Sequence, residues 1–181
     1  MGIKKKLFIL GILIFLLPIK TIAKAESDHL LATIIEYGYY DFFLEPLKQE
    51  SDYSRSEYAQ KGGLPLLNKQ TNKIPLKKGR LMAFHFNISE LPDLGDSMPL
   101  TVIIDHPEFI KPDGSKSNQM TKESVAKIRN GKAFRAEGYR FDHDYELVEG
   151  KWKFTISYLN KILLVHEFET FLPLDNYLYS H

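Results

Sequence analysis

The sequence contains no cysteine. Disulfide bonds and thiolate metal sites are therefore excluded, and so is a lipid anchor carried by a cysteine at a cleavage point. A chain without such links must hold its fold by burying apolar side chains, and 181 residues are ample for one core. We expect a single folded domain.

Long apolar runs are scarce, because residues 7–17 form the one such run, and it is too short to span a bilayer comfortably. A lysine triplet at residues 4–6 precedes it, and Ala-Lys-Ala at residues 23–25 follows it. This order predicts a signal peptide over residues 1–25, with Glu26 as the mature N-terminus. An uncleaved anchor is the alternative. We expect a protein exported to the periplasm or secreted, without stable membrane insertion after cleavage.

Basic charge is also scarce once the leader is removed. The leader holds five lysines and no acid, so 24 basic residues less five leave 19 against 23 acidic residues, a net charge of −4. Binding to nucleic acid depends on neutralising phosphates with basic side chains. A mildly acidic domain without a basic stripe predicts no nucleic-acid partner.

What the remainder has is β patterning. Apolar residues alternate with polar ones, β-branched and aromatic residues are frequent, and turn residues separate the segments. Asn130-Gly131 is typical of a type I′ hairpin, although residues 121–129 could instead begin as a helical turn. Strand-forming segments are predicted at residues 30–43, 63–79, 80–88, 99–106, 121–141, 152–158 and 162–171.

These segments predict an all-β domain over residues 26–171. Because a half-apolar sheet needs a second layer to cover it, an antiparallel two-sheet β-sandwich of seven or eight strands is expected. Residues 44–63 are polar and are predicted to form a long loop, and residues 172–181 a C-terminal tail. Gly150 permits a turn before the single tryptophan. The predicted core side chains are Phe84, Phe86, Trp152, Phe154, Ile156 and Phe168.

Three stretches resemble a bacterial family known as domain of unknown function 3859. They are "GLPLLNKQTNKIPLKKGRLMAFHF", "GYRFDHDYELVEGKWKF" and "LLVHEF", and the resemblance covers roughly residues 33 to 170. It implies an exported, immunoglobulin-like β-sandwich and no particular activity. The matching positions are Ile74, Pro75, Gly79, Gly138, Tyr139, Phe141, Asp142, Glu146, Leu147, Val148, Gly150, Trp152, Phe154 and Phe168.

The densest group of polar residues lies in "FDHDYELVEGKWKF", residues 141–154. If this stretch is extended, Asp142, Asp144 and Glu146 share one face and His143 points away. Three carboxylates could hold a hard cation such as Ca²⁺, but the ligand order of an EF-hand is absent. We therefore favour a solvated strand face entering a corner, with these carboxylates as the candidates for a metal site.

Catalytic motifs are not found. "HEFET", residues 166–170, begins like a zinc-protease helix, but Thr170 replaces the second histidine and the pattern is that of a strand. His85, His106 and Asp105 could form a site only if the fold brought them together. Nucleophile elbows, phosphate loops and dinucleotide fingerprints are absent from the sequence.

The sequence thus favours a non-catalytic exported module, without a cofactor, that binds an unknown protein or an envelope or surface component. The first alternative is a calcium- or zinc-dependent enzyme or metal-binding protein that uses Asp142, Asp144 and Glu146. The second alternative is a small outer-membrane β-barrel, although charges occur on both faces of the predicted strands.

Overall fold

The computed structural model describes residues 29–43 and 64–173, and every structural statement below concerns these residues. The predicted signal peptide, the predicted loop at 44–63 and the tail from residue 174 lie outside them. No helix in this part of the chain is long and apolar enough to cross a bilayer. The strands are β1 (Leu31–Phe43), β2 (Leu64–Lys69), β3 (Lys73–Pro75), β4 (Leu81–Ser89), β5 (Ser97–Ile110), β6 (Lys116–Arg129), β7 (Lys132–Arg140), β8 (Gly150–Tyr158) and β9 (Lys161–Phe171).

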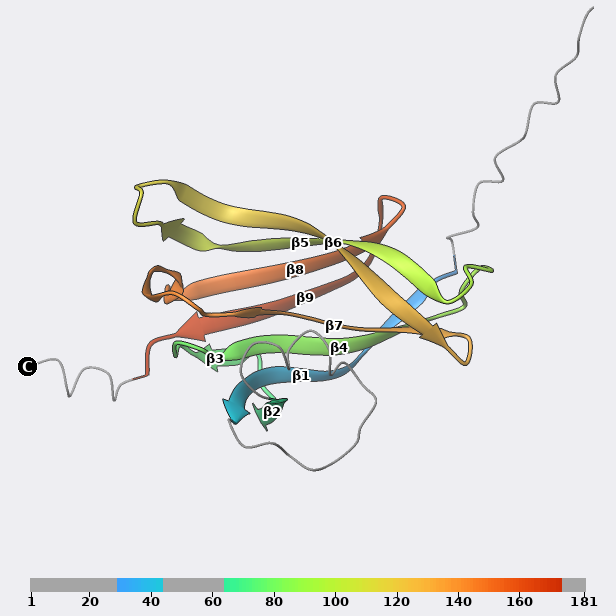
Figure 1. The fold of residues 1–181 in the computed structure, drawn as a ribbon, viewed down its shortest axis with the longest axis horizontal. Helices are drawn as coiled ribbons and strands as arrows, with labels where there is room; N and C mark the ends of the chain where they lie inside the picture. Colours follow the sequence, from blue (N-terminus) through green and yellow to red (C-terminus); the bar gives the residue numbers. More distant parts are fainter. Residues whose placement is uncertain (1–28, 44–63, 174–181) are drawn as a thin grey trace, which may run out of the picture.

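These nine strands form one sheet in the order β2-β1-β4-β7-β6-β5-β8-β9-β3 (Figure 1). All neighbouring pairs are antiparallel except β3 and β9, which are parallel. The prediction of an all-β fold is confirmed. The prediction of two separate antiparallel sheets with seven or eight strands is wrong, because the nine strands form a single mixed sheet that curls strongly on itself.

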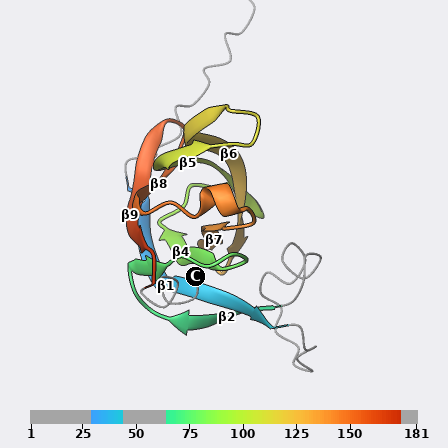
Figure 2. The ribbon, with the colours of Figure 1, turned by 90° about the vertical axis from the view of Figure 1, so that its left-hand side faces the viewer.

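The curl brings the two halves of the sheet face to face. Strands β6 and β7 pair only at Lys127–Arg129, next to the turn that joins them. Further from this turn, β6 pairs with β5 and β7 pairs with β4. Figure 2 shows the result, with β1 and β2 on one side of the molecule and β5 and β6 on the other. The Phe84 ring of β4 lies 5.5 Å from that of Phe154 and 6.4 Å from that of Phe168, between ring centroids. One curled sheet therefore covers its own apolar face.

The core lies between these two halves. Trp152 is fully buried, and its indole contacts the rings of Tyr139 and Phe141 at centroid distances of 4.8 and 5.7 Å. Gly150 adopts a φ of 143°, and a Cβ at this position would lie 2.9 Å from the Pro107 ring. The side chains expected in the core, Phe84, Phe86, Trp152, Phe154, Ile156 and Phe168, are all at most 2% exposed.

The turn between β6 and β7 follows its sequence. Asn130 and Gly131 have φ values of 51° and 72°, as the two central positions of a type I′ turn require. The predicted hairpin is confirmed, and the helical alternative for residues 121–129 is wrong because β6 is continuous there. The β8–β9 turn uses Leu159 and Asn160 in the same left-handed region.

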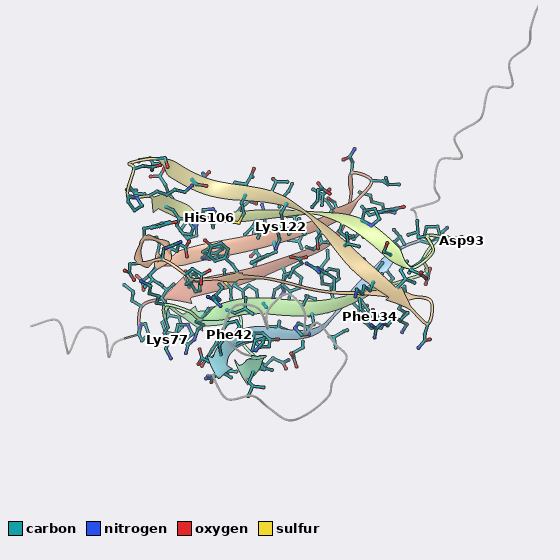
Figure 3. All side chains as sticks on the ribbon, viewed as in Figure 1. Phe42, Lys77, Asp93, His106, Lys122 and Phe134 are labelled. Carbon is teal, nitrogen blue, oxygen red and sulfur yellow. The ribbon has the colours of Figure 1, made fainter. Side chains whose placement is uncertain are left out.

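A buried ion pair closes one end of the curl. Both oxygens of Asp41 on β1 accept hydrogen bonds of 2.9 Å from the guanidinium of Arg80, which also donates to the carbonyl of Pro75 on β3 at 2.9 Å. The guanidinium lies 4.3 Å from the centre of the Tyr39 ring. Since β3 forms one edge of the sheet and β1 lies next to the other edge, Arg80 ties the two ends together. Phe42 and Lys77 mark this end in Figure 3.

We expect Asp41→Asn to lower the free energy of unfolding by about 2–4 kcal/mol at neutral pH, since the buried guanidinium loses its counter-charge. Hydrogen bonds from Arg80 hold the pKa of Asp41 below its usual range. The stabilisation that the Asp41–Arg80 pair gives the fold is therefore fully present at a pH above the pKa of Asp41 in the unfolded chain. It is lost as the pH falls through the lower pKa of Asp41 in the folded protein. The difference between wild type and variant, measured by urea unfolding, should shrink in acid.

The matched control is Asp144→Asn. It removes an ion pair with Lys78 whose two side chains are 80% and 56% exposed, so about 0.5 kcal/mol or less is expected. Equal losses in the two variants would contradict a structural role for the Asp41–Arg80 pair.

Candidate functional site

The predicted acidic cluster lies at the corner between β7 and β8, and it is not extended. Residues Asp144–Glu146 form a short 3₁₀ helix, η2. The carboxylate of Glu146 turns inward, is 6% exposed, and accepts backbone N–H groups of Asp142 at 2.7 Å and His143 at 3.0 Å. Burial and a hydrogen bond to Glu146 raise the pKa of Tyr139. Glu146 therefore caps the corner from the inside.

The two aspartates point elsewhere. The carboxylate of Asp142 accepts a hydrogen bond of 2.5 Å from the guanidinium of Arg140. The carboxylate of Asp144 lies 3.0 Å from the ammonium of Lys78. The expectation that these two aspartates and Glu146 share one face is wrong, because the 3₁₀ turn separates them. Among residues 29–43 and 64–173, no three side chains of metal-ligating type are grouped to hold an ion. The arrangement reverses the chain between two strands.

We expect Glu146→Ala to lower the free energy of unfolding by about 2 kcal/mol, because two backbone N–H groups lose a charged acceptor. Asp142→Ala, which removes an exposed ion pair in the same corner, should cost clearly less. Thermal unfolding with and without Ca²⁺ or Zn²⁺ completes the test. A metal-dependent rise in Tm that Asp144→Asn abolishes would restore the metal-site alternative.

The histidines do not form a site with Asp105. His106 stacks in the core, with its ring centre 4.2 Å from that of Phe109. His85 lies on the opposite face of β4 from the core and stacks on Tyr40 at 5.8 Å, where burial lowers its pKa. The carboxylate of Asp105 is 2.8 Å from the ammonium of Lys153 on the outer surface. The structure therefore places these three residues in separate environments.

The "HEFET" motif lies in β9, as its pattern predicts. His166 packs between the rings of Tyr37 and Phe84, at 5.3 and 5.0 Å, and burial lowers its pKa. Thr170 donates its hydroxyl to the carbonyl of Val148 at 2.8 Å. Both residues hold β9 against its neighbours, and neither presents a ligand to solvent.

A buried carboxylate that the sequence analysis missed joins the halves where β6 and β7 diverge. Glu137 of β7 is 1% exposed. Its Oε1 accepts bonds from Ser124 at 2.5 Å and Arg135 at 2.8 Å, and its Oε2 lies 2.8 Å from the ammonium of Lys122, labelled in Figure 3. Burial opposes its charged form, but these partners outweigh burial and hold the pKa of Glu137 below its usual range. We call this group the Glu137 clamp.

The divergence leaves a long strand edge open. Strand β6 pairs with β7 only at residues 127–129, so residues 116–126 have no strand on that side within the described chain. We call residues 116–126 the β6 edge. Its outward side chains include Thr121, Glu123 and Val125, and Val125 is 51% exposed. Unpaired N–H and C=O groups along such an edge can accept an added extended segment.

The geometry defines an all-β domain built on one curled sheet. A solved immunoglobulin-like protein from Pseudomonas aeruginosa has the same fold, with a TM-score of 0.51 and 22% identity over 77% of this chain and 96% of that one. The chain belongs to the family described as domain of unknown function (DUF3859), whose model matches residues 29–170. The resemblance inferred from sequence is thereby confirmed.

Two enzymes give partial structural matches. A β-glucosidase from Listeria innocua aligns at 11% identity with a TM-score of 0.35, over 55% of this chain and 14% of that one. A β-glucosidase from Kluyveromyces marxianus aligns at 13% identity with a TM-score of 0.37, over 77% of this chain and 14% of that one. Neither match carries an argument about activity. No curated protein matches the chain.

Proposed function

We propose that the chain is an exported, non-catalytic module that binds a protein or an envelope component through the β6 edge. The observation that carries the proposal is the strand edge at residues 116–126, which β7 leaves open. The lysine-rich leader with its Ala-Lys-Ala site supports export to the periplasm or beyond.

The β6 edge is held rigidly, which favours binding. Strand β6 pairs with β5 along residues 116–127, and the Glu137 clamp fixes Lys122 and Ser124 from the inner side. A preorganised edge loses little conformational entropy when a partner strand joins it. Backbone hydrogen bonds would supply affinity in this mode.

Specificity would come from the outward side chains. Thr121 and Val125 offer a small apolar surface, and Glu123, whose carboxylate accepts a bond from Thr101 at 3.3 Å, lies between them in sequence. A partner segment with a basic side chain opposite Glu123 and short apolar ones beside it fits this pattern. The charge of Glu123 also discourages unspecific pairing at the edge.

The test is affinity capture from a native envelope extract with protein produced from the full-length sequence. The recovered chain should begin at Glu26. The double variant Thr121→Lys/Val125→Lys should capture at least about tenfold less of a component that wild type retains. Added charges on an edge oppose strand addition.

Leu159→Lys serves as the matched control, since Leu159 is 63% exposed in the β8–β9 turn, away from β6. It should retain the component. Equal capture by all three proteins would refute the β6 edge as the binding site. A recovered chain that still begins at Met1 would refute cleavage of the leader.

A further inference from the structure

A second open edge lies on the first half of strand β1. Strand β2 pairs with β1 only from Tyr39 to Phe43. On that side, residues 31–38 have no paired strand within the described part of the chain. This edge is on the other flank of the folded sheet from the β6 edge, beside β9, whose His166 ring lies 5.3 Å from that of Tyr37 (Figure 2).

The composition of this edge differs from that of β2, β3 and the β6 edge. Strand β2 carries Pro65 and Lys69, and β3 is three residues long and carries Lys73 and Pro75. The β6 edge contains lysine and glutamate. Proline and short strands hinder association at a sheet edge, and charges restrict it to a partner of complementary charge, as proposed for the β6 edge. Residues 31–35, Leu-Ala-Thr-Ile-Ile, contain no charge and no proline.

The burial of this segment alternates. Leu31, Thr33 and Ile35 are exposed, whereas Ala32 and Ile34 pack against the core. Leu31 and Ile35 are 55% and 56% exposed, which is much for large aliphatic side chains in a strand. The outward row is therefore apolar at both ends and carries a hydroxyl in the middle.

This row is complementary to itself. If residues 31–35 pair antiparallel with the same segment of a second copy, and the two-fold axis passes at Thr33, Leu31 lies opposite Ile35 of the copy. Residues opposite each other in an antiparallel pair share a face and contact each other. Two Leu–Ile contacts then form, one on each side of a Thr–Thr pair. A charge at the axis would meet its own copy and repel it, and Thr33 carries none.

Local structure limits the pairing to these residues. The register of β1 against β4 shifts between Ile34 and Glu36, which marks a bulge at Ile35, the last residue of the row, before pairing with β4 resumes at Glu36. The carboxylate of Glu36 is already engaged, because Tyr40 donates its hydroxyl to it at 2.7 Å. On the neighbouring β9, Ile162 and Val165 are 61% and 47% exposed and extend the apolar surface beside the pair.

We propose that residues 31–35 form a dimer interface in which a second copy of this chain pairs antiparallel about Thr33. The pairing joins the β2-β1-β4-β7 halves of the two copies into one continuous sheet. It removes an uncharged strand end from solvent and leaves the β6 edge of each copy open. The dimer does not depend on the function proposed above, because the two edges lie on different flanks.

Cross-linking gives the sharpest test, because the chain has no cysteine and one introduced thiol is unique. Directly opposed residues of an antiparallel pair have Cα atoms about 4.5–5.5 Å apart, within the range that a disulfide spans. Thr33→Cys should therefore form a covalent dimer in high yield under mild oxidation with glutathione. Val125→Cys, at a site that is 51% exposed on β6, should remain largely monomeric.

The register has its own test. The double variant Leu31→Cys/Ile35→Cys should cross-link, because the thiol at position 31 of one copy lies opposite the thiol at position 35 of the other. Each single variant lacks the opposing thiol and should not cross-link. Cross-linking of either single variant, together with no cross-linking of Thr33→Cys, would overturn the proposed register. Equal yields for Thr33→Cys and Val125→Cys would overturn the interface.

Sedimentation velocity tests the contact without a cross-link. Wild type should show a concentration-dependent dimer between about 1 and 300 µM, and Thr33→Lys should weaken it by at least about tenfold in Kd. Val125→Lys and Thr33→Ser should match wild type. Far-UV circular dichroism confirms that each variant is folded. A wild type that stays monomeric across this range, or a dimer that Thr33→Lys leaves intact, would refute the proposal.

Discussion

The structure depends on contact between the two halves of a single sheet around Trp152. The chain has no disulfide, and the described part has only one short 3₁₀ helix, so within that part the sheet's apolar face is covered by the sheet itself. Phe84 on one half meets Phe154 and Phe168 on the other, and Trp152 meets Phe141 in the same way. Burial of a large apolar side chain is worth about 1.5–3 kcal/mol, so this aromatic layer supplies the main stabilisation.

When one sheet folds onto itself, its outer strands are not held together by apolar contacts alone. Polar side chains link strands at two places. The Arg80–Asp41 pair joins β1 to β3 at one end, and the Glu137 clamp joins β7 to β6 where these strands separate. Between the tied points, backbone groups of β6 and of β1 stay unpaired within the described chain. The candidate binding edges are therefore a direct consequence of the way the core is covered.

Local patterns in the sequence predict much of this fold. The alternation around Phe84 and Trp152 identifies the inward faces, and Asn130-Gly131 fixes the β6–β7 turn. The strand order could not be predicted, because it depends on which distant segments pair. The sequence favours a strand face entering a corner at residues 141–147, whereas in the structure Glu146 folds back and caps two N–H groups of a short 3₁₀ turn.

The candidate binding edges could not be predicted from the sequence for a related reason. A strand edge is open when no other strand pairs with it, so the edges on β6 and β1 can be identified only once the strand pairing is known. The Glu137 clamp left a trace, since Arg135 and Glu137 share the parity of Tyr139 and should face inward. The burial of Glu137 becomes understandable only with Lys122, which β6 brings to it.

Fluorescence of the one tryptophan tests the central claim most directly. Trp152 is fully buried, and its Nε1 has no hydrogen-bond partner within the described residues. The folded protein should emit at clearly shorter wavelength than tryptophan in water and resist quenching by acrylamide. On urea unfolding, the red shift should coincide with the loss of far-UV circular dichroism in one transition. Water-like, readily quenched emission from the folded protein would contradict an account in which the halves of the sheet close around this indole.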